Sequence, residues 1–269
     1  MARPKFVPLP SQSPRRFEPL LGAGYRRVEE MAGRARERFD GRAVWHFNST
    51  LRGGGVAEML RGLLPYVRGA GIDTRWVVLR ERPEFFELTK RIHNNLHGNP
   101  GDGGELGAAE HELYERCLAA SARHFSNLVQ PRDVVFLHDP QTAGLAAAAK
   151  AAGAIVVWRC HIGTDAPNDF VDEAWSFLRP YIDCADVLIF SRRQHVWTGI
   201  DHDRVRIVPP AIDHRSAKNQ PLAPESIDAI LHAAGLHSKP GGGSATYVRR
   251  EGDTEIASDF GYVGDDVGR

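Results

Sequence analysis

The sequence predicts an α/β fold, a Rossmann-like doubly wound parallel sheet. Short apolar segments alternate with longer segments whose apolar residues recur at helical spacing, which is typical of strands joined by helices. Several of the apolar segments are continuous, as strands buried on both faces of a parallel sheet require. Polar residues follow where several of them end, and such sheets bind ligands at the carboxyl ends of their strands. The sequence therefore predicts a ligand site at one edge of the sheet.

Composition and charge narrow the class of protein. The chain has 269 residues, and 34 Lys and Arg balance 34 Asp and Glu. This balance gives no reason to expect a nucleic-acid or anionic-membrane partner. We expect neither a signal peptide nor a membrane span, because no apolar run is long enough. Cys117, Cys160 and Cys184 form no C-x-x-C pair, which favours a reduced cytoplasm over a disulfide framework or a cysteine-rich zinc site.

The N-terminal 40 residues differ in character from the rest of the chain. Residues up to about Leu21 are rich in proline and polar groups and predict an arm lying on the surface. Residues 25–39 are strongly charged with sparse apolar positions, which predicts a surface helix. We therefore assign 1–40 to an arm and a surface helix that precede the main domain.

The alternation that predicts the sheet fills residues 41–214. The predicted strands are 43–48, 72–79, 133–137, 154–158, 187–190 and 205–208. The predicted helices are 56–67, 85–96, 110–128, 142–152, 170–181 and a short one at 193–197, with a glycine-rich loop at 98–107. Residues 215–269 are expected to be a linker and the truncated start of a further domain, with one helix at 224–236 and no strong element from 237 onward.

Three consecutive glycines, Gly53, Gly54 and Gly55, separate the first predicted strand from the helix after it. Backbone approaches a ligand closely where side chains are absent, and the first amides of a helix attract anions. This favours a phosphate-binding loop over a flexible turn, the alternative. The loop lacks the Gly-Lys-Ser/Thr of a P-loop. It also lacks the third glycine of the dinucleotide-binding fingerprint, which argues against an NAD-dependent dehydrogenase. We expect the Glu58 carboxylate to complement the helix dipole in the first turn and not to act in catalysis.

Other chemically capable side chains stand at the predicted strand ends. They are His46 and Asn48 on the first strand, His138, Asp139 and Gln141 after the third, and Arg159 and His161 after the fourth. A histidine at such an edge can donate a hydrogen bond to a sugar hydroxyl or to a developing negative charge. The alternative for His161 is a structural role, in which its ring hydrogen-bonds only to the backbone of its loop. Asp139 either meets sugar hydroxyls or caps the next helix. Arg159 is either an anion contact or half of an internal ion pair.

Two other kinds of chemistry have weak support in the sequence. No Gly-x-Ser-x-Gly elbow appears, and Cys160 has no distinctive context for a nucleophile. No His-x-x-x-His or paired-carboxylate spacing stands out as a metal site. We therefore expect no metal and no cofactor.

Four motifs occur together in a recognisable order. They are Val44-Trp45-His46-Phe47-Asn48-Ser49-Thr50 with Gly-Gly-Gly-Val-Ala-Glu, Leu137-His138-Asp139-Pro140-Gln141, Trp158-Arg159-Cys160-His161-Ile162 and Val208-Pro209-Pro210-Ala211-Ile212-Asp213. With these motifs the segment 42–222 resembles the N-terminal half of trehalose synthases of the glycosyltransferring type. Those enzymes are retaining GT-B glycosyltransferases of family 4. The glycine loop alone would indicate only the wider superfamily.

The resemblance implies a fold and a reaction. It implies the N-terminal, acceptor-side half of a GT-B fold and glucose transfer, with retention, from a nucleoside diphosphate glucose to glucose. Gly53, Gly54 and Gly55 would face the donor phosphates, and His161 would contact the transferred sugar as the catalytic residue. The remaining residues would bind the acceptor sugar: His46, Asn48, His138, Asp139, Gln141 and Arg159.

We expect this chain to depart from that family by lacking the donor domain and the Glu-x7-Glu segment that such a domain carries. We expect a fragment or a split gene, inactive alone, whose partners are small sugars and a C-terminal donor domain or a separate donor polypeptide. A homodimer is left open. The alternatives are a trehalose phosphorylase-like or other disaccharide-forming transferase, and a non-catalytic sugar-binding module.

Overall fold

A computed structural model describes residues 4–213, 215–216, 219–236, 238, 242–248 and 254–257. The chain forms two compact units, Met1–Ala211 and Ile212–Arg269. The first unit holds the sheet and every candidate site residue. The second contains helix α9 (Pro224–Ala233) and an antiparallel pair of short strands, β8 (Thr246–Val248) and β9 (Thr254–Ile256).

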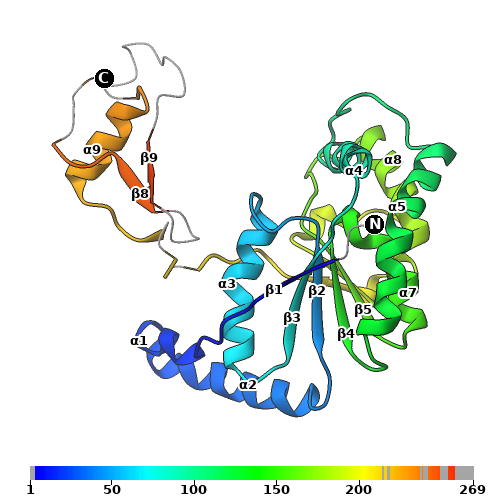
Figure 1. The fold of residues 1–269 in the computed structure, drawn as a ribbon, viewed down its shortest axis with the longest axis horizontal. Coiled ribbons are helices and arrows are strands. Elements are labelled where there is room, and N and C mark those ends of the chain that lie inside the picture. The colour runs from blue at the N-terminus through cyan, green and yellow to red at the C-terminus, as the bar shows by residue number, and fades with distance from the viewer. Residues whose placement is uncertain are drawn as a thin grey trace. The chain divides into compact units, whose positions relative to one another are not determined.

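The first unit is built on a seven-stranded sheet in the order β1-β3-β2-β4-β5-β6-β7 (Figure 1). All neighbouring strands are parallel except the edge pair β1 and β3. The strands are β1 (Lys5–Val7), β2 (Val44–Asn48), β3 (Thr74–Val78), β4 (Val134–His138), β5 (Ile155–Cys160), β6 (Val187–Phe190) and β7 (Val205–Ile207). This confirms the predicted Rossmann-like parallel sheet.

Helices cover both faces of this sheet. Figure 1 shows α3 on one face and α4, α5, α7 and α8 on the other. The helices are α1 (Glu18–Leu21), α2 (Tyr25–Arg38), α3 (Gly55–Gly69), α4 (Pro83–Leu96), α5 (Ala108–Leu128), α6 (Pro140–Ala143), α7 (Ala146–Ala151) and α8 (Asp169–Ile182). The described part of this unit also contains 3-10 turns: η1 (Pro14–Phe17) and η2 (Gly22–Gly24) flank α1, and η3 (Arg193–His195) and η4 (His202–Arg204) lie between β6 and β7.

Strand alternation divides the core between the two faces. Trp45, Phe47 and Trp158 point into the large cluster beneath α4, α5 and α8, and each is at most 1% exposed. A smaller cluster beneath α3 contains Leu60 and Trp76. Because β2, β4 and β5 are buried on both faces, the polar side chains on them must find partners within the protein.

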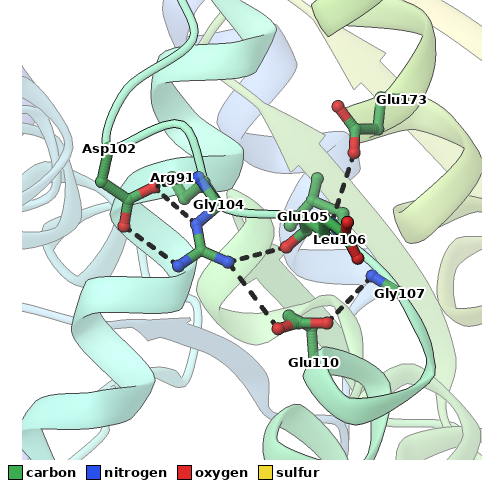
Figure 2. Close-up of polar contacts among 8 residues, drawn as sticks. All are labelled: Arg91, Asp102, Gly104, Glu105, Leu106, Gly107, Glu110 and Glu173. Atoms are coloured by element: carbon green, nitrogen blue, oxygen red, sulfur yellow. Dashed lines mark hydrogen bonds and ion pairs between the residues drawn. The ribbon is translucent and has the colours of Figure 1, made fainter.

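The glycine-rich loop between α4 and α5 is organised by one guanidinium, that of Arg91 (Figure 2). Arg91 donates from Nε and Nη2 to the two oxygens of Asp102, at 2.6 and 3.0 Å, and from Nη1 to the Glu105 carbonyl at 2.7 Å. A Cβ on Gly104 would lie 2.2–2.6 Å from the guanidinium atoms, so a side chain at this position would displace the Arg91 guanidinium from its present place. The loop is thereby held against the start of α5, where Glu110 accepts from the Gly107 amide at 3.0 Å.

Two predicted features of the chain are wrong, and the N-terminal arm has more regular structure than predicted. The arm contributes an edge strand, β1, because its prolines flank rather than interrupt Lys5–Val7. The helix predicted at 142–152 is broken near Gly144, whose amide donates to the Tyr114 hydroxyl at 2.9 Å. A Cβ there would lie 2.6 Å from the Tyr114 ring, so the chain approaches α5 closely only because the residue is glycine. Beyond 237 the chain does form strands, β8 and β9.

None of the helices in the described residues has the length and apolar character needed to cross a membrane.

Asp133, just before β4, is the buried anchor of the amino-terminal edge of the sheet. It is 4% exposed and accepts from the Ala43 amide at 2.8 Å, the Trp45 indole at 2.9 Å and the Gln130 amide at 2.9 Å. Asp133→Ala leaves these donors without their acceptor, and we expect it to lower the free energy of unfolding by about 3 kcal/mol.

All five tryptophans lie between 45 and 197, so tryptophan fluorescence during urea unfolding reports this unit alone. Asp40→Ala is the matched control, because Asp40 is exposed; it should change the free energy by less than about 0.5 kcal/mol. Equal losses in the two variants would contradict the anchoring role of Asp133.

Candidate functional site

The glycine loop joins the end of β2 to the start of α3. Gly53 and Gly54 have φ angles of 72° and 101°, in the region that favours glycine. A Cβ added at Gly53, Gly54 or Gly55 would meet no atom within 4 Å, so the space above the loop is open. Gly54, the N-cap residue of α3, has no side chain to cap the helix, and the first turn of a helix presents backbone amides that attract an anion.

Side chains hold the approach to this loop in place. Asn48 accepts from the Trp76 indole at 2.8 Å and donates to the Thr50 carbonyl at 2.7 Å, so both ends of its amide are occupied. The Thr50 hydroxyl donates to the Arg52 carbonyl at 2.6 Å and lies 3.1 Å from the Gly53 carbonyl. The roles of Thr50 and Trp76 were not predicted from the sequence; the apolar strand that carries Trp76 beside the first strand was the available signal.

Asp139 lies at the end of β4 with a left-handed φ of 61°, an uncommon conformation for a residue other than glycine. Its carboxylate accepts from the His161 amide at 2.7 Å, and no side-chain hydrogen bond from it caps α6. Its own amide donates to the Arg159 carbonyl at 2.9 Å, and its carbonyl accepts from the Trp158 indole at 3.1 Å. Asp139 therefore ties β4 to the segment that carries His161.

Three histidines form a hydrogen-bonded row across β2, β4 and β5. His46 Nδ1 lies 3.1 Å from His138 Nε2, and His138 Nδ1 lies 3.0 Å from His161 Nε2. His46 is 7% exposed and His138 2% exposed, whereas His161 is half-buried. The ring of Phe136 stacks on that of His46, with centroids 4.7 Å apart. Of the three imidazoles, His161 is the most accessible.

Arg159 and Gln141 complete the set at this edge. Arg159 lies within β5 rather than after it, is 8% exposed, and donates to the Val208 carbonyl at 3.4 Å. Its Nε is buried without a hydrogen-bond partner in the described part of the chain. Gln141 is half-buried in the first turn of α6. A buried guanidinium with a free donor is suited to an anionic or hydroxyl-rich ligand.

Burial dominates the electrostatics of the site. Burial and the positive charge of Arg159 lower the pKa of His46 and of His161 to about 3, and burial, with the neighbouring histidines, lowers the pKa of His138 well below its usual value. Burial raises the pKa of Asp139 to about 7 against the hydrogen bond from His161. Burial also lowers the pKa of Arg159. At neutral pH the row is therefore uncharged.

The predicted strand-end residues occupy one edge of the sheet, since β2, β4 and β5 are parallel neighbours. One contiguous set of side chains lies at this edge. Hydrogen bonds join the three imidazoles to one another, and the His161 amide donates to Asp139. The set consists of His46, His138, Asp139, Arg159 and His161. The glycine loop follows β2 at the same edge. The direct contact between buried histidines was not anticipated from the sequence, although their matching parity on adjacent buried strands was a usable signal.

Residues 46–197 match a family model described as "Trehalose synthase, N-terminal domain". The matched region contains the glycine loop, the histidine row, Asp139 and Arg159. The chain belongs to the trehalose synthase N-terminal domain family. Its sheet is therefore the N-terminal half of a GT-B fold, as the four motifs indicated.

Individual relatives agree with the family. The trehalose synthase of Rubrobacter xylanophilus is 34% identical over 214 residues, covering 79% of this chain and 49% of that protein. A trehalose phosphorylase of Pleurotus sajor-caju is 28% identical over 224 residues, covering 77% of this chain and 29% of that protein. The chain thus spans about half the length of the trehalose synthase that it matches.

A solved structure resembles the fold. The N-terminal domain of Candida albicans trehalose-6-phosphate phosphatase superposes with a TM-score of 0.51, covering 72% of this chain and 54% of that one, at 12% identity. At this identity the likeness concerns the fold alone.

The glycine loop of this family member allows a paired test of backbone strain. Gly54→Ala places a side chain at φ 101°, where only glycine is at ease, and should lower the free energy of unfolding by about 1–3 kcal/mol. Gly55→Ala is the matched control. It has equal open space and no positive φ, and should be neutral or slightly stabilising in α3. Urea midpoints followed by tryptophan fluorescence measure both, and similar losses would contradict the assigned loop conformation.

The buried histidine row makes stability depend on pH. Between pH 4 and 6.5 the unfolded chain binds protons that the folded row excludes, because folding lowers the three histidine pKa values. Asp139 acts oppositely, because its raised pKa keeps a proton on the folded state up to about pH 7. The three histidines together shift the proton balance more than the one aspartate does, so the free energy of unfolding should rise from pH 4 to 6.5.

Asp139→Asn separates these two effects. The amide oxygen still accepts from the His161 N–H, and the opposing carboxyl is gone. The rise between pH 4 and 6.5 should steepen by up to about 1.4 kcal/mol per pH unit. Urea unfolding at half-unit pH intervals measures both slopes; a flat profile in the parent protein would contradict the neutral row.

Proposed function

We propose that this chain is the acceptor-side domain of a retaining glucosyltransferase. In a longer assembly it would transfer glucose from a nucleoside diphosphate glucose to free glucose and form trehalose. The observation that carries the proposal is the position of His161, Asp139 and Arg159 at the same strand edge as an open glycine loop, in a chain of the trehalose synthase N-terminal domain family. A cytoplasmic location stays a prediction.

The glycine loop would face the donor diphosphate. Gly53, Gly54 and Gly55 present backbone without side chains, and the first turn of α3 adds backbone amides that have no acceptor within the helix. Stabilising the leaving diphosphate is the main electrostatic task of such a transfer. A partner domain would supply the other half of this site, as a further part of the same protein or as a separate donor polypeptide. We therefore expect the nucleotide sugar to bind weakly to this chain alone.

The sugars would lie beside the strand edge. His161 would hydrogen-bond the transferred sugar as the catalytic residue, held in place by the bond from its amide to Asp139. Arg159 and Gln141 would contact the acceptor from the adjacent strand and helix. Asn48 and the two buried histidines would shape the floor of the acceptor site. No metal is needed for these roles.

Trehalose phosphorolysis is the second candidate. The match to a trehalose phosphorylase over 77% of this chain supports it, although at lower identity than the match to a trehalose synthase. A phosphorylase would use inorganic phosphate where the transferase releases a nucleotide. A non-catalytic module is the third candidate; it would bind glucose or trehalose without turnover.

The test of the transferase proposal is a fusion of the full chain to the C-terminal half of the Rubrobacter xylanophilus trehalose synthase. With glucose and a panel of nucleoside diphosphate glucoses, the fusion should form trehalose, detected by chromatography. His161→Ala should lower kcat by about 100-fold, as expected when a group at the reacting centre is lost. His202→Ala, an exposed residue in η4, is the matched control and should leave kcat unchanged.

The same fusion separates the alternatives. Glucose 1-phosphate formed from trehalose and phosphate, with no nucleotide requirement, would favour the phosphorylase. Glucose binding to the folded chain, measured by saturation-transfer NMR, without any turnover would favour the sugar-binding module. A folded fusion that neither binds glucose nor forms trehalose would refute the assignment.

A further inference from the structure

The row His46–His138–His161 joins two buried imidazoles to a half-buried one through directed hydrogen bonds. Its two hydrogen bonds, 3.1 and 3.0 Å long, run Nδ1 to Nε2 in the same sense along neighbouring strands. Successive ring planes differ by only 21° and 24°, and the ring centroids lie 5.4 and 5.3 Å apart, about as far as the two N···N distances require for rings joined end to end. The bonded nitrogens therefore point toward one another. Each bond requires one donor and one acceptor nitrogen.

Neutrality restricts how the protons can be arranged. Burial lowers the pKa of each ring below neutrality, so each imidazole carries one N–H at pH 7. If His138 holds its proton on Nδ1, it donates to His161 and must accept from His46. If it holds the proton on Nε2, both bonds reverse. The two bonds survive together only when all three rings have the same tautomer.

The consequence appears at the accessible end of the row. His161 uses Nε2 for the row, and among the described residues nothing hydrogen-bonds to its Nδ1. With all protons on Nδ1, that nitrogen is a donor; with all protons on Nε2, it is an acceptor. The hydrogen-bonding form that His161 offers is thus coupled to His46, two rings away.

We infer that His46 and His138 are positioning residues, which fix the tautomer of His161 and so decide whether Nδ1 donates to or accepts from a sugar hydroxyl. This rests on the proposed function for the sugar, but the coupling itself does not. A proton store is a different role and does not fit, since burial and the positive Arg159 disfavour a charged ring anywhere in the row. Asp139 fixes the backbone of His161, and the row fixes its ring.

The first test needs neither sugar nor turnover. Long-range ¹H–¹⁵N correlation NMR of the histidine-labelled full chain at pH 7 reports the tautomer of each ring. The row predicts one shared tautomer, all Nδ1–H or all Nε2–H, for His46, His138 and His161. Mixed tautomers among the three, or a charged ring, would overturn the inference without any variant being made.

The second test is His46→Phe, which keeps a ring against Phe136 and removes the nitrogen. His161 should change from a single tautomer to a mixture, although it does not touch residue 46. His93→Phe is the matched control: burial also lowers the pKa of His93, to about 4, but it lies on α4 outside the row. An unchanged His161 tautomer in a folded His46→Phe chain would mean that the row is merely structural.

Trehalose titration then separates this inference from the proposed function, because trehalose contains the transferred glucosyl unit that His161 would contact. If both hold, His46→Phe should weaken trehalose binding by about 3- to 10-fold, the effect of losing one hydrogen bond, whereas His93→Phe should not. If the tautomers are coupled and trehalose does not bind the parent chain, the positioning row stands and the sugar assignment fails. Equal trehalose affinity in the parent and His46→Phe proteins would overturn the positioning role.

Discussion

Burial of β2, β4 and β5 on both faces is the constraint on which the rest of this structure depends. It favours partners inside the protein for the polar groups on those strands, because an unpaired buried donor or acceptor costs free energy; Arg159 Nε is an exception. At the amino-terminal edge Asp133 collects three donors. At the carboxyl edge the histidines bond to one another, and Asp139 accepts from the backbone. The same requirement thus builds an anchor at one end and a preorganised polar site at the other.

Preorganisation at the carboxyl edge carries local strain. Asp139 has a left-handed backbone, a conformation that costs about 1–3 kcal/mol and persists only where its surroundings enforce it. Bonds to Trp158, Arg159 and His161 enforce it here, through its carbonyl, amide and carboxylate. The glycine loop avoids such strain, because the residues with positive φ there are glycines and carry no side chain. One part of the site is rigid and buried, and the other is open; this division suits a sugar on one side and a diphosphate on the other.

The principal strands could be predicted from the sequence because each is a short, continuous apolar run. Helices α5 and α8 could be predicted because each is a long segment with helical spacing of its apolar residues. It failed where the deciding contact is distant in sequence. The break near Gly144 depends on the Tyr114 hydroxyl some thirty residues earlier. Strand β1 depends on an unpaired edge of β3. Strands β8 and β9 have three residues each, too few for a periodic signal.

The sequence by itself determined the parallel α/β sheet, the position of the glycine loop and the identity of the polar residues at the strand ends, because periodicity and residue type are local properties. It also contained the motifs by which the family is identified. Only the tertiary structure decided what those residues touch. His46 lies on β2, His138 ends β4 and His161 directly follows β5, and only lateral strand pairing brings their nitrogens to about 3 Å. Asp139 likewise bonds to the His161 amide rather than capping α6, because the register of β4 and β5 places that amide within its reach.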